Sequence, residues 1–421
     1  MSDAATARSG QRVAATVALT AGAAARLLAV LDRDGEEARI IGGAVRNALL
    51  GEPLGDFDIA TTAQPDEVIH RTEAAGFKAV PTGIDHGTLT VVIDGRPFEV
   101  TTLREDVETF GRKATVRFGR DWKADAERRD FTMNALSVTA DGTLHDYVGG
   151  LDDLRDRRVR FIGDPATRIA EDYLRILRFF RFHAAYGEGA LDAAGLHACI
   201  AARAGLERLS RERVRMEVIK LLVARGAEPV LWTMAETGLL LAVLGGVPLI
   251  TTFAAMQERE AVLGLAPDAI RRLGALAVLV TEDAERLWQR LRLANAEYKR
   301  LMAMGEGWWR VTPHDGERSA RVLLYRLGPQ SFADRVLMGW AHADAYASDA
   351  DWRALATLPQ RWTAPAFPLK AADFIARGVA KGPALGTAMR AAESAWVVAG
   401  FPMDATALAR IADTTAAAAT G

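Results

Sequence analysis

The pattern of apolar and polar positions changes about one third of the way along the chain. As far as residue 150, short β-rich runs such as 38–41 and 86–93 alternate with amphipathic helical patterns. Beyond residue 150 the strand signals fade, and apolar residues recur at helical spacing, most clearly over 166–186. This division predicts an α+β fold, in which a mixed sheet with helices precedes an all-helical remainder.

Start and turn signals place further elements within the mixed part. We expect helices over 23–31 and from Pro65 to about Ala75, the second with its proline in the first turn. Asp94-Gly95 separates two β-rich runs and predicts a hairpin. The strongly charged stretch 104–125 has little periodicity and predicts a long loop.

The chain has 421 residues, which is too long for one ordinary core. We expect four segments: a flexible N-terminal extension over 1–22, a mixed head over 23–150, a helical neck over 151–225, and a helical body and tail over 226–421. The last residues are rich in Ala and Thr and are expected to fray.

Composition excludes several classes of protein. The net charge is −2, so any surface that binds nucleic acid has to be local. The only cysteine, Cys199, excludes a disulfide framework and a cysteine-based zinc site, and it fits a reducing cytoplasm. No apolar run approaches the length of a membrane span. We therefore expect a cytoplasmic protein without membrane contact.

Two short motifs near the start of the mixed part suggest nucleotide chemistry. Gly42-Gly43 stands between a strand and a helix, where the backbone can approach a phosphate closely, and Arg46 lies one turn further on. Asp56 and Asp58 are two residues apart in a predicted strand, so both carboxylates leave one face. Such carboxylates repel each other unless a divalent cation lies between them and a triphosphate. Each motif alone is more often an ordinary turn or a solvated strand edge, but their order and closeness favour a nucleotide site.

Further charged residues extend this picture. Glu99, on the second strand of the predicted hairpin, is either a third carboxylate facing the pair or an exposed strand residue. Arg128-Arg129-Asp130, before Phe131, suggests a helix start that binds an anion, although a capped surface helix fits the same residues.

The helical pattern over 166–186 carries an unusual set of charges. Helical spacing puts Glu171, Arg175 and Arg178 along one stripe, with Asp172 beside Arg175. A salt-bridged helix face is the alternative, yet Arg181 brings the arginines to three against two acids, which leaves spare donors. The charges of the later helix over 208–223 predict a solvated or internally paired face.

Together, these stretches resemble the class II tRNA nucleotidyltransferases, which are the CCA-adding enzymes, and the related bacterial poly(A) polymerases. Gly-Gly-Ala-Val-Arg with Asp-Phe-Asp looks like the first motif of that family, and Arg-Arg-Asp-Phe-Thr-Met-Asn-Ala looks like its second. Glu171-Asp172 with Arg175 looks like its nucleotide-reading motif. The motifs span 40–182, and beyond them the resemblance is one of architecture. Asn47 and Tyr173 depart from the residues common in the family, an aspartate and a proline.

The resemblance implies a head of the DNA polymerase β type, followed by helical neck, body and tail, with tRNA as the partner and CTP and ATP as substrates. Asp56 and Asp58 would be the catalytic residues and would hold two Mg²⁺ ions. No obligate protein partner is expected, and the body and tail are expected to bind tRNA. The nucleotide would be bound by Gly43, Arg46, Arg129, Asp172, Arg175, Arg178 and Arg181.

Donor and acceptor patterns explain how one pocket could choose C and A. A carboxylate at Asp172 only accepts hydrogen bonds, so it suits the exocyclic amino groups of C and A, while Arg175 only donates. U and G would turn a carbonyl toward Asp172, at a cost of about 1–3 kcal/mol when buried. Arg181 is expected to turn away from Asp172 because the helical spacing drifts.

Four alternatives bear on the reaction. Poly(A) polymerases tend to carry basic terminal extensions, which this chain lacks. Enzymes that add only CC have a shortened loop between the first two motifs, whereas 104–125 is full length. A non-catalytic RNA binder would gain nothing from Asp56 and Asp58. The sequence therefore favours CCA addition and leaves addition of A alone open.

Overall fold

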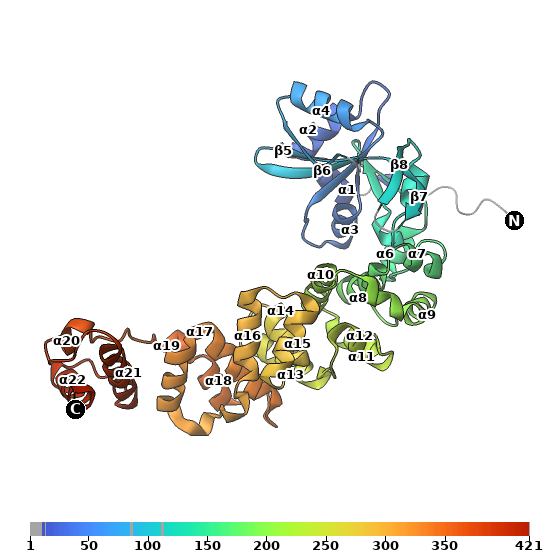
Figure 1. Ribbon diagram of the computed structural model, residues 1–421. Helices are drawn as coiled ribbons and strands as arrows, with labels where there is room; N and C mark the ends of the chain where they lie inside the picture. The colour runs from blue at the N-terminus through green and yellow to red at the C-terminus, as the bar shows by residue number, and fades with distance from the viewer. Residues whose placement is uncertain (1–10, 13, 85–86, 111–112, 421) are drawn as a thin grey trace. The chain divides into compact units, whose positions relative to one another are not determined.

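The computed structural model describes residues 11–12, 14–84, 87–110 and 113–420. The chain forms two compact units, Met1–Val243 and Leu244–Gly421 (Figure 1). The predicted head and neck both lie in the first unit. Among the described residues, no helix is both long and apolar enough to cross a membrane.

The first unit is built around one mixed sheet, which confirms the predicted α+β fold. Within the described residues the sheet has eight strands in the order β1-β10-β9-β2-β3-β6-β5-β4, and β3 and β6 run parallel while the other pairs are antiparallel. All four residues of the central strand β2 are buried. The strands are β1 (Gln11–Arg12), β2 (Ala38–Ile41), β3 (Phe57–Thr61), β4 (Lys78–Gly83), β5 (Thr88–Ile93), β6 (Arg96–Thr102), β9 (Ser137–Thr139) and β10 (Thr143–His145).

The prediction that rests on the Asp94-Gly95 turn is confirmed in this sheet. Asp94 and Gly95 have φ of 51° and 76°, which gives the left-handed turn that matches strand twist, so the predicted hairpin is confirmed as β5–β6. The predicted start of that hairpin at His86 lies outside the described residues. The helices of this part are α1 (Ala14–Leu19), α2 (Gly22–Leu31), α3 (Gly43–Leu50), α4 (Pro65–Ala74), α5 (Trp122–Glu127) and the 3₁₀ turn η2 (Thr132–Asn134).

The stretch 104–125 is not a long loop. It forms an antiparallel ribbon of β7 (Arg104–Phe110) and β8 (Lys113–Phe118), followed by the start of α5. A two-stranded ribbon completes its own ladder of hydrogen bonds without a continuous apolar face, so hydrophobic periodicity does not detect it.

The N-terminal segment is folded where the structure describes it. β1 pairs with β10, and in α1 the side chain of Leu19 is fully buried. The buried Thr16 hydroxyl donates to the Gly142 carbonyl at 2.8 Å. We expected a flexible extension over 1–22 because the segment has no compact apolar core. The part of it that the structure describes contacts residues much later in the chain, and Thr16 and Gly142 are 126 positions apart.

The predicted helix over 166–186 is two helices. Asp172 is extended, with φ of −154° and ψ of 107°, and its carboxylate accepts a hydrogen bond from the Leu174 N–H at 3.1 Å. A short side chain that bonds to the backbone in this way competes with helix continuation and starts a new helix. Glu171 and Arg175 are therefore not on one continuous stripe.

Helices continue through the rest of the first unit. They are α6 (Gly150–Arg155), α7 (Pro165–Glu171), α8 (Leu174–Tyr186), α9 (Ala193–Ala201), η3 (Arg203–Arg208), α10 (Arg211–Leu222), α11 (Ala227–Glu236) and α12 (Leu239–Leu244), whose last residue belongs to the second unit. Aromatic rings join the head to this helical layer: Phe131 lies 4.9 Å from Phe161 and 5.2 Å from Phe182, between ring centroids.

The second unit is helical, as predicted for the body and tail. Its elements are α13 (Ile250–Val262), α14 (Ala269–Ala277), α15 (Thr281–Leu291), α16 (Asn295–Gly305), η4 (Trp308–Arg310), η5 (Pro313–Asp315), α17 (Gly316–His342), α18 (Ala350–Ala356), α19 (Leu358–Arg361), α20 (Ala371–Ile375), α21 (Pro383–Val398) and α22 (Ala405–Thr420). A buried ion network crosses it: Arg271 donates to Glu260 and Asp334, and Arg272 also donates to Glu260.

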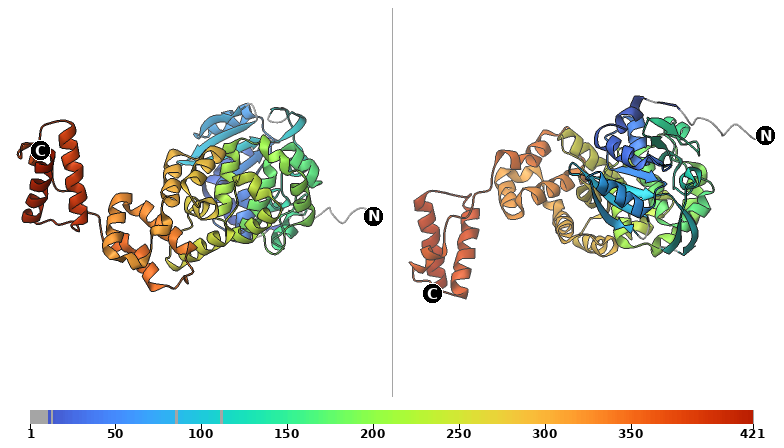
Figure 2. Two further views of the ribbon diagram at one scale, coloured as in Figure 1. Left: turned by 60° about the horizontal axis from the view of Figure 1, so that its bottom comes forward. Right: turned by 90° about the horizontal axis from the view of Figure 1, so that it is seen from above.

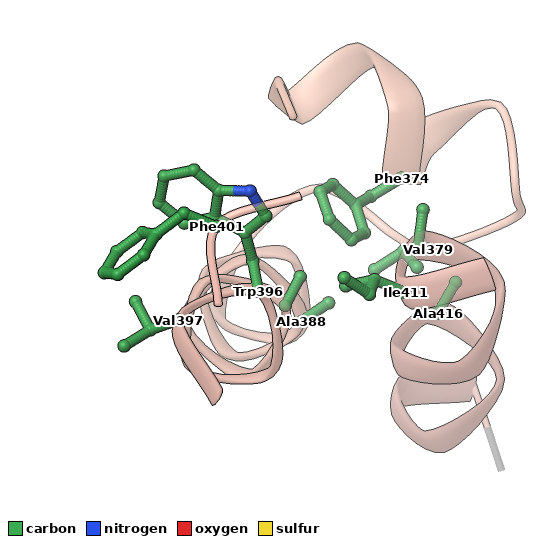
Figure 3. Close-up of a cluster of buried hydrophobic side chains, with 10 residues drawn as sticks. Phe374, Val379, Ala388, Trp396, Val397, Phe401, Ile411 and Ala416 are labelled. Atoms are coloured by element: carbon green, nitrogen blue, oxygen red, sulfur yellow. The ribbon is translucent and has the colours of Figure 1, made fainter. Parts of the chain in front are cut away.

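The C-terminal helices have a core of their own. α21 and α22 lie side by side (Figure 2), and Trp396 packs with Phe374, Phe401 and small residues of α22 (Figure 3). α22 continues to Thr420 and buries Ala412 and Ala416, so this end is not frayed over the described residues. Alanine-rich composition suits close packing of two helices as well as it suits a loose end.

Candidate active site

Gly42 brings the backbone of the glycine turn next to two charged side chains. It has φ of 66° and ψ of −124°, a conformation that residues with a Cβ rarely adopt. A Cβ built on Gly42 would lie 3.6 Å from Nη1 of Arg129 and 3.9 Å from Oδ2 of Asp58. The next residue, Gly43, begins α3, so free N–H groups of a helix start lie beside a guanidinium and a carboxylate.

Asp58 and Glu99 are neighbours on parallel strands. They are register partners in the β3–β6 pair, so their side chains leave the same face of the sheet. Asp56 immediately precedes β3 and is exposed. Burial, with the negative charges of Glu99 and Asp56, raises the pKa of Asp58 to about 6, although Arg129 acts in the opposite direction. The sheet register thus puts Glu99 beside Asp58 as a third carboxylate, although Glu99 is also an exposed strand residue, so both interpretations describe it.

This carboxylate group suits a hard divalent cation. Burial and neighbouring carboxylates make the negative charge of Asp58 unfavourable, and a bound cation would offset this cost. Within the part of the chain that the structure describes, no three His, Cys, Asp or Glu side chains form a closed metal cluster. An open site of one or two carboxylates, completed by substrate phosphates and water, is the usual arrangement for Mg²⁺.

Arg129 is held in place by a buried aspartate. Asp125 accepts hydrogen bonds from Arg129 at 2.9 Å and from Arg128. Burial by itself would raise the pKa of Asp125, but the two guanidiniums hold it below its usual range. The arginines were expected at a helix start. They instead follow the C-terminal end of α5, where the helix dipole interacts favourably with positive charges.

Arg46 is buried, with 6% of its surface exposed. Its Nη1 donates to Asn134 Oδ1 at 2.5 Å, its Nη2 donates to the Tyr186 hydroxyl at 2.9 Å, and Nε and Nη2 both donate to Asn47 Oδ1. Four of its five N–H groups are thus engaged within the protein. Burial lowers the pKa of Arg46, and the hydrogen bond with Tyr186 partly offsets this.

Asp172 has an arginine partner that the sequence did not reveal. Nη2 and Nη1 of Arg213, on α10, donate to its two oxygens at 2.6 Å and 3.3 Å. The side chain of Asp172 keeps about one third of its surface exposed. Arg213 was assigned to a solvated or internally paired helix face, whereas it reaches across to the α7–α8 break.

Arg175, on the other side of that break, is fixed by different groups. It forms an ion pair with Glu171 and donates to the Arg168 carbonyl at 2.7 Å and the Arg128 carbonyl at 3.5 Å. Its side chain is 16% exposed. Glu171 and Arg175 thus form the salt bridge of the alternative interpretation, in spite of the break between the two helices.

Arg178 and Arg181 use their donors on acids of other elements. Arg178 donates to Asp130 Oδ2 at 2.7 Å, and Arg181 is paired with Glu217 of α10. The surplus of arginines over 171–181 is therefore balanced by acids outside that stretch. The surplus of arginines was a signal that acids elsewhere in the chain pair with them, but it could not identify Asp130 and Glu217.

The predicted residues fall into three places. The structure brings Gly42, Gly43, Asp58 and Arg129 together, with Asp56 and Glu99 beside them. Asp172 and Arg175 flank the α7–α8 break. Arg178 and Arg181 lie in the layer between head and neck, and Arg46 connects that layer to Gly43, where a Cβ would lie 3.6 Å from its Nη2. Sequence reasoning missed Asp125 and Tyr186. It included Asn134 only as part of the second motif, and it assigned Arg213 and Glu217 to a solvated or internally paired face.

Comparison with known proteins matches two stretches of the chain to known families. The family described as Poly A polymerase head domain matches residues 38–160, and the family described as the probable RNA and SrmB-binding site of polymerase A matches 191–251. CCA tRNA nucleotidyltransferase 1, mitochondrial, of Danio rerio is 34% identical over 394 residues, which cover 90% of this chain and 87% of that protein.

Bacterial proteins match over similar lengths. The CCA-adding enzyme of Limosilactobacillus fermentum is 31% identical over 369 residues, covering 86% of this chain and 89% of that protein. Among solved structures, the Bacillus stearothermophilus CCA-adding enzyme in complex with CTP has a TM-score of 0.70 at 28% identity, covering 89% of this chain and 92% of that chain.

Proposed function

Because the chain belongs to the family of the class II CCA tRNA nucleotidyltransferases, we propose that the site around Asp58 adds CCA to tRNA 3′ ends from CTP and ATP. The observation that carries this proposal is the placement of Gly42, Asp58 and Arg129 within about one side-chain length of each other. The reaction is template-independent nucleotidyl transfer: the terminal hydroxyl of the tRNA attacks the α-phosphate, and pyrophosphate leaves.

The family uses divalent metal ions, and we propose Mg²⁺ held by Asp56 and Asp58 in this chain. When bound, the metal lowers the pKa of the attacking hydroxyl and neutralises charge on the phosphates. Burial, together with the negative charges of Glu99 and Asp56, disfavours the ionised Asp58 carboxylate and raises its pKa to about 6, and a bound cation would relieve this cost. Glu99 therefore tunes the affinity of the site for the cation.

The triphosphate is bound by the glycine turn and by arginines. The N–H groups at Gly43 and the start of α3 face an anion favourably. Arg129 is oriented by Asp125 and lies beside Gly42, where it can reach the triphosphate and the sugar. Arg46 lies beside Gly43 and has one N–H group left for the same anion.

The choice of base rests on the hydrogen-bond acceptor positions of the Asp172 carboxylate that no group of the described residues occupies. A carboxylate offers about four lone-pair positions. Arg213 and the Leu174 N–H use three of them, two on Oδ1 and one on Oδ2. The position that remains can only accept, so it suits the amino group of C or A and disfavours a carbonyl of U or G. Arg175 supplies the donor side, and Arg178 and Arg181, which are paired with Asp130 and Glu217, support the helix behind it.

The partner is tRNA. We propose that the helical neck over 151–225 reads the nucleotide and that the body and tail over 226–421 bind tRNA, mainly through phosphate contacts on local basic surface. The match of 191–251 to an RNA-binding family supports a contribution from the first unit as well. We place the protein in the cytoplasm, on the single buried cysteine Cys199, although some relatives are named as mitochondrial.

An extension assay at single-nucleotide resolution tests the proposal. Purified protein is incubated with Mg²⁺ and a tRNA that lacks CCA, or one that ends in CC, with CTP, ATP or both. Addition of C, C and A followed by a stop is the expected result. A single A on the CC-ended tRNA alone would mean an A-adding enzyme, a long A ladder would mean a poly(A) polymerase, and no product would overturn the proposal.

A further inference from the structure

Arg46 joins the glycine turn to a helix of the neck. Its guanidinium carbon lies 4.0 Å from the centroid of the Tyr186 ring, and Nη2 donates to the hydroxyl of the same tyrosine at 2.9 Å. Tyr186 is the last residue of α8, whereas Arg46 is in α3, which begins at Gly43. Arg46 thus both stacks on the ring of Tyr186 and donates a hydrogen bond to its hydroxyl.

A second route connects the same two helices. Nη1 of Arg46 donates to Asn134 Oδ1, and Asn134 Nδ2 donates to Asp130 Oδ1 at 3.0 Å. Asp130 is in turn bound by Arg178 of α8 at 2.7 Å. Burial would raise the pKa of Asp130, but Arg178 and Asn134 hold it below its usual range, so this carboxylate stays ionised.

The two routes form a closed ring of contacts. α8 meets Arg46 directly through Tyr186 and indirectly through Arg178, about two helical turns earlier. Two separate anchors on one rigid helix fix the position of the Arg46 guanidinium relative to α8. The aromatic ring of Phe182 lies within this circuit of contacts. The guanidinium carbons of Arg46 and Arg178 are each 5.2 Å from its centroid.

α8 also carries the base-reading end of the site. It begins directly after Asp172 and Tyr173, and Arg175 is in its first turn. At about 1.5 Å per residue, Arg175 and Tyr186 are roughly 16 Å apart along the helix. One helix therefore connects the groups that select the base with the arginine beside the phosphate-binding turn.

We propose that Tyr186 is a positioning residue that holds the Arg46 guanidinium beside Gly43 and so sets the spacing between the triphosphate and base ends of the nucleotide site. This inference rests on the proposed function of the site, in which a nucleoside triphosphate spans both ends. Tyr186 itself touches no substrate. Its hydroxyl removes rotational freedom from Arg46, and its ring shields the charge from water.

The test compares Tyr186→Phe and Tyr186→Leu in the full-length protein. Phe keeps the stacked ring and removes the hydroxyl acceptor, whereas Leu removes both. We expect Tyr186→Phe to weaken CTP and ATP equally, raising both KM and the equilibrium Kd about 3- to 10-fold, because one hydrogen bond to a charged group is lost. The value of kcat should stay within about two-fold, and Tyr186→Leu should have the larger effect.

The chain offers a matched control. The Tyr147 hydroxyl accepts a hydrogen bond from Nη1 of Arg39 at 3.0 Å, and Arg39 is buried to the same extent as Arg46, with 6% of its surface exposed. Tyr147→Phe removes the same kind of hydrogen bond from the same unit and should leave KM and Kd unchanged. Melting temperatures of all variants show whether the two tyrosines contribute equally to stability.

Two outcomes would overturn the role of Tyr186. One is an unchanged nucleotide Kd in both Tyr186 variants. The other is a fall in kcat at constant KM that is proportional to the fraction of protein that is unfolded. Because Kd is measured without turnover, it tests Tyr186 even if the wild-type protein fails to extend tRNA, a result that would overturn the proposed function alone.

Discussion

Asp58 and Glu99 show how the register of two paired strands changes the properties of single residues. The parallel pairing of β3 with β6 puts the two carboxyl groups next to each other. The folded, metal-free protein therefore keeps a proton on Asp58 up to a pH of about 6, while the unfolded chain releases it near its ordinary value of 3.8. Stability contributed at low pH is thus lost as the pH rises through this window.

Asp58→Asn is expected to stabilise the metal-free protein at pH 7 while abolishing its activity. The neutral amide removes a disfavoured charge, worth roughly 1–2 kcal/mol after allowance for partial solvent exposure. Melting temperatures in a chelator at pH 7 and pH 4 should show a gain at pH 7 that shrinks at pH 4, and extension should fall at least about 100-fold. In the exposed Asp56→Asn control, activity should fall without a comparable stability gain. Equal melting temperatures of wild type and Asp58→Asn at pH 7 would contradict the account.

Arg213 is expected to control fidelity. In Arg213→Leu, Asp172 loses a two-pronged partner and its carboxylate can turn, so discrimination against UTP and GTP should drop about 10-fold, which corresponds to about 1.4 kcal/mol. Arg213→Lys should recover only part of it, because an ammonium cannot reproduce the fork.

Misincorporation measured with each nucleotide alone checks this prediction. Arg225→Leu is the control, since Arg225 forms an exposed ion pair with Glu188 in the same unit and such pairs contribute little. Full discrimination in Arg213→Leu would mean that Asp172 needs no orienting partner.

At the scale of elements, the break between α7 and α8 is held by packing as well as by hydrogen bonds. A Cβ on Gly205, in η3, would lie 1.9 Å from an atom of the Tyr173 ring, so only glycine lets this turn lie against the break. The break is what allows Asp172 to face Arg213 instead of continuing a helix.

Gly205→Ala is expected to displace Tyr173 and destabilise the protein by about 1–3 kcal/mol. Extension activity should fall further than stability explains, because Asp172 moves with the break. Gly386→Ala is the control: in α21 the new Cβ meets only the end of Arg390, and helix propensity favours alanine, so stability should be unchanged or rise by up to about 1 kcal/mol. Thermal unfolding measures the stability of both variants. Equal melting temperatures would show that the Tyr173 side chain moves away from the new Cβ at no cost in stability.

At the scale of the whole molecule, a net charge of −2 has to be reconciled with a polyanionic partner. Phosphate contacts by local arginine and lysine residues release counterions, so tRNA affinity should fall by at least about 10-fold between 50 and 200 mM salt. Binding titrations at both salt concentrations measure this, with CTP binding as the internal comparison. An affinity for tRNA that is independent of salt would exclude phosphate contact as its basis.

Short-range patterns in the sequence determined the parts of the fold that depend on neighbouring residues. The strand at 38–41, the helix from Pro65 and the turn at Asp94-Gly95 rest on periodicity, helix starts and left-handed glycine turns, and the structure contains each of them. The same holds for the change to an all-helical chain after residue 150. The motif residues from Gly42 to Arg181 were sufficient to indicate the family.

Only the tertiary structure decided what depends on contacts between distant parts of the chain. The ribbon over 104–118 lacks a periodic apolar signal, and the break at Asp172 is secured by Arg213 and by the closeness of Gly205. Partners for Arg46 are 88 and 140 residues away, in Asn134 and Tyr186. Periodicity reports which residues are buried, whereas charge partners are chosen by where separate elements meet, and that information is absent from any local stretch of sequence.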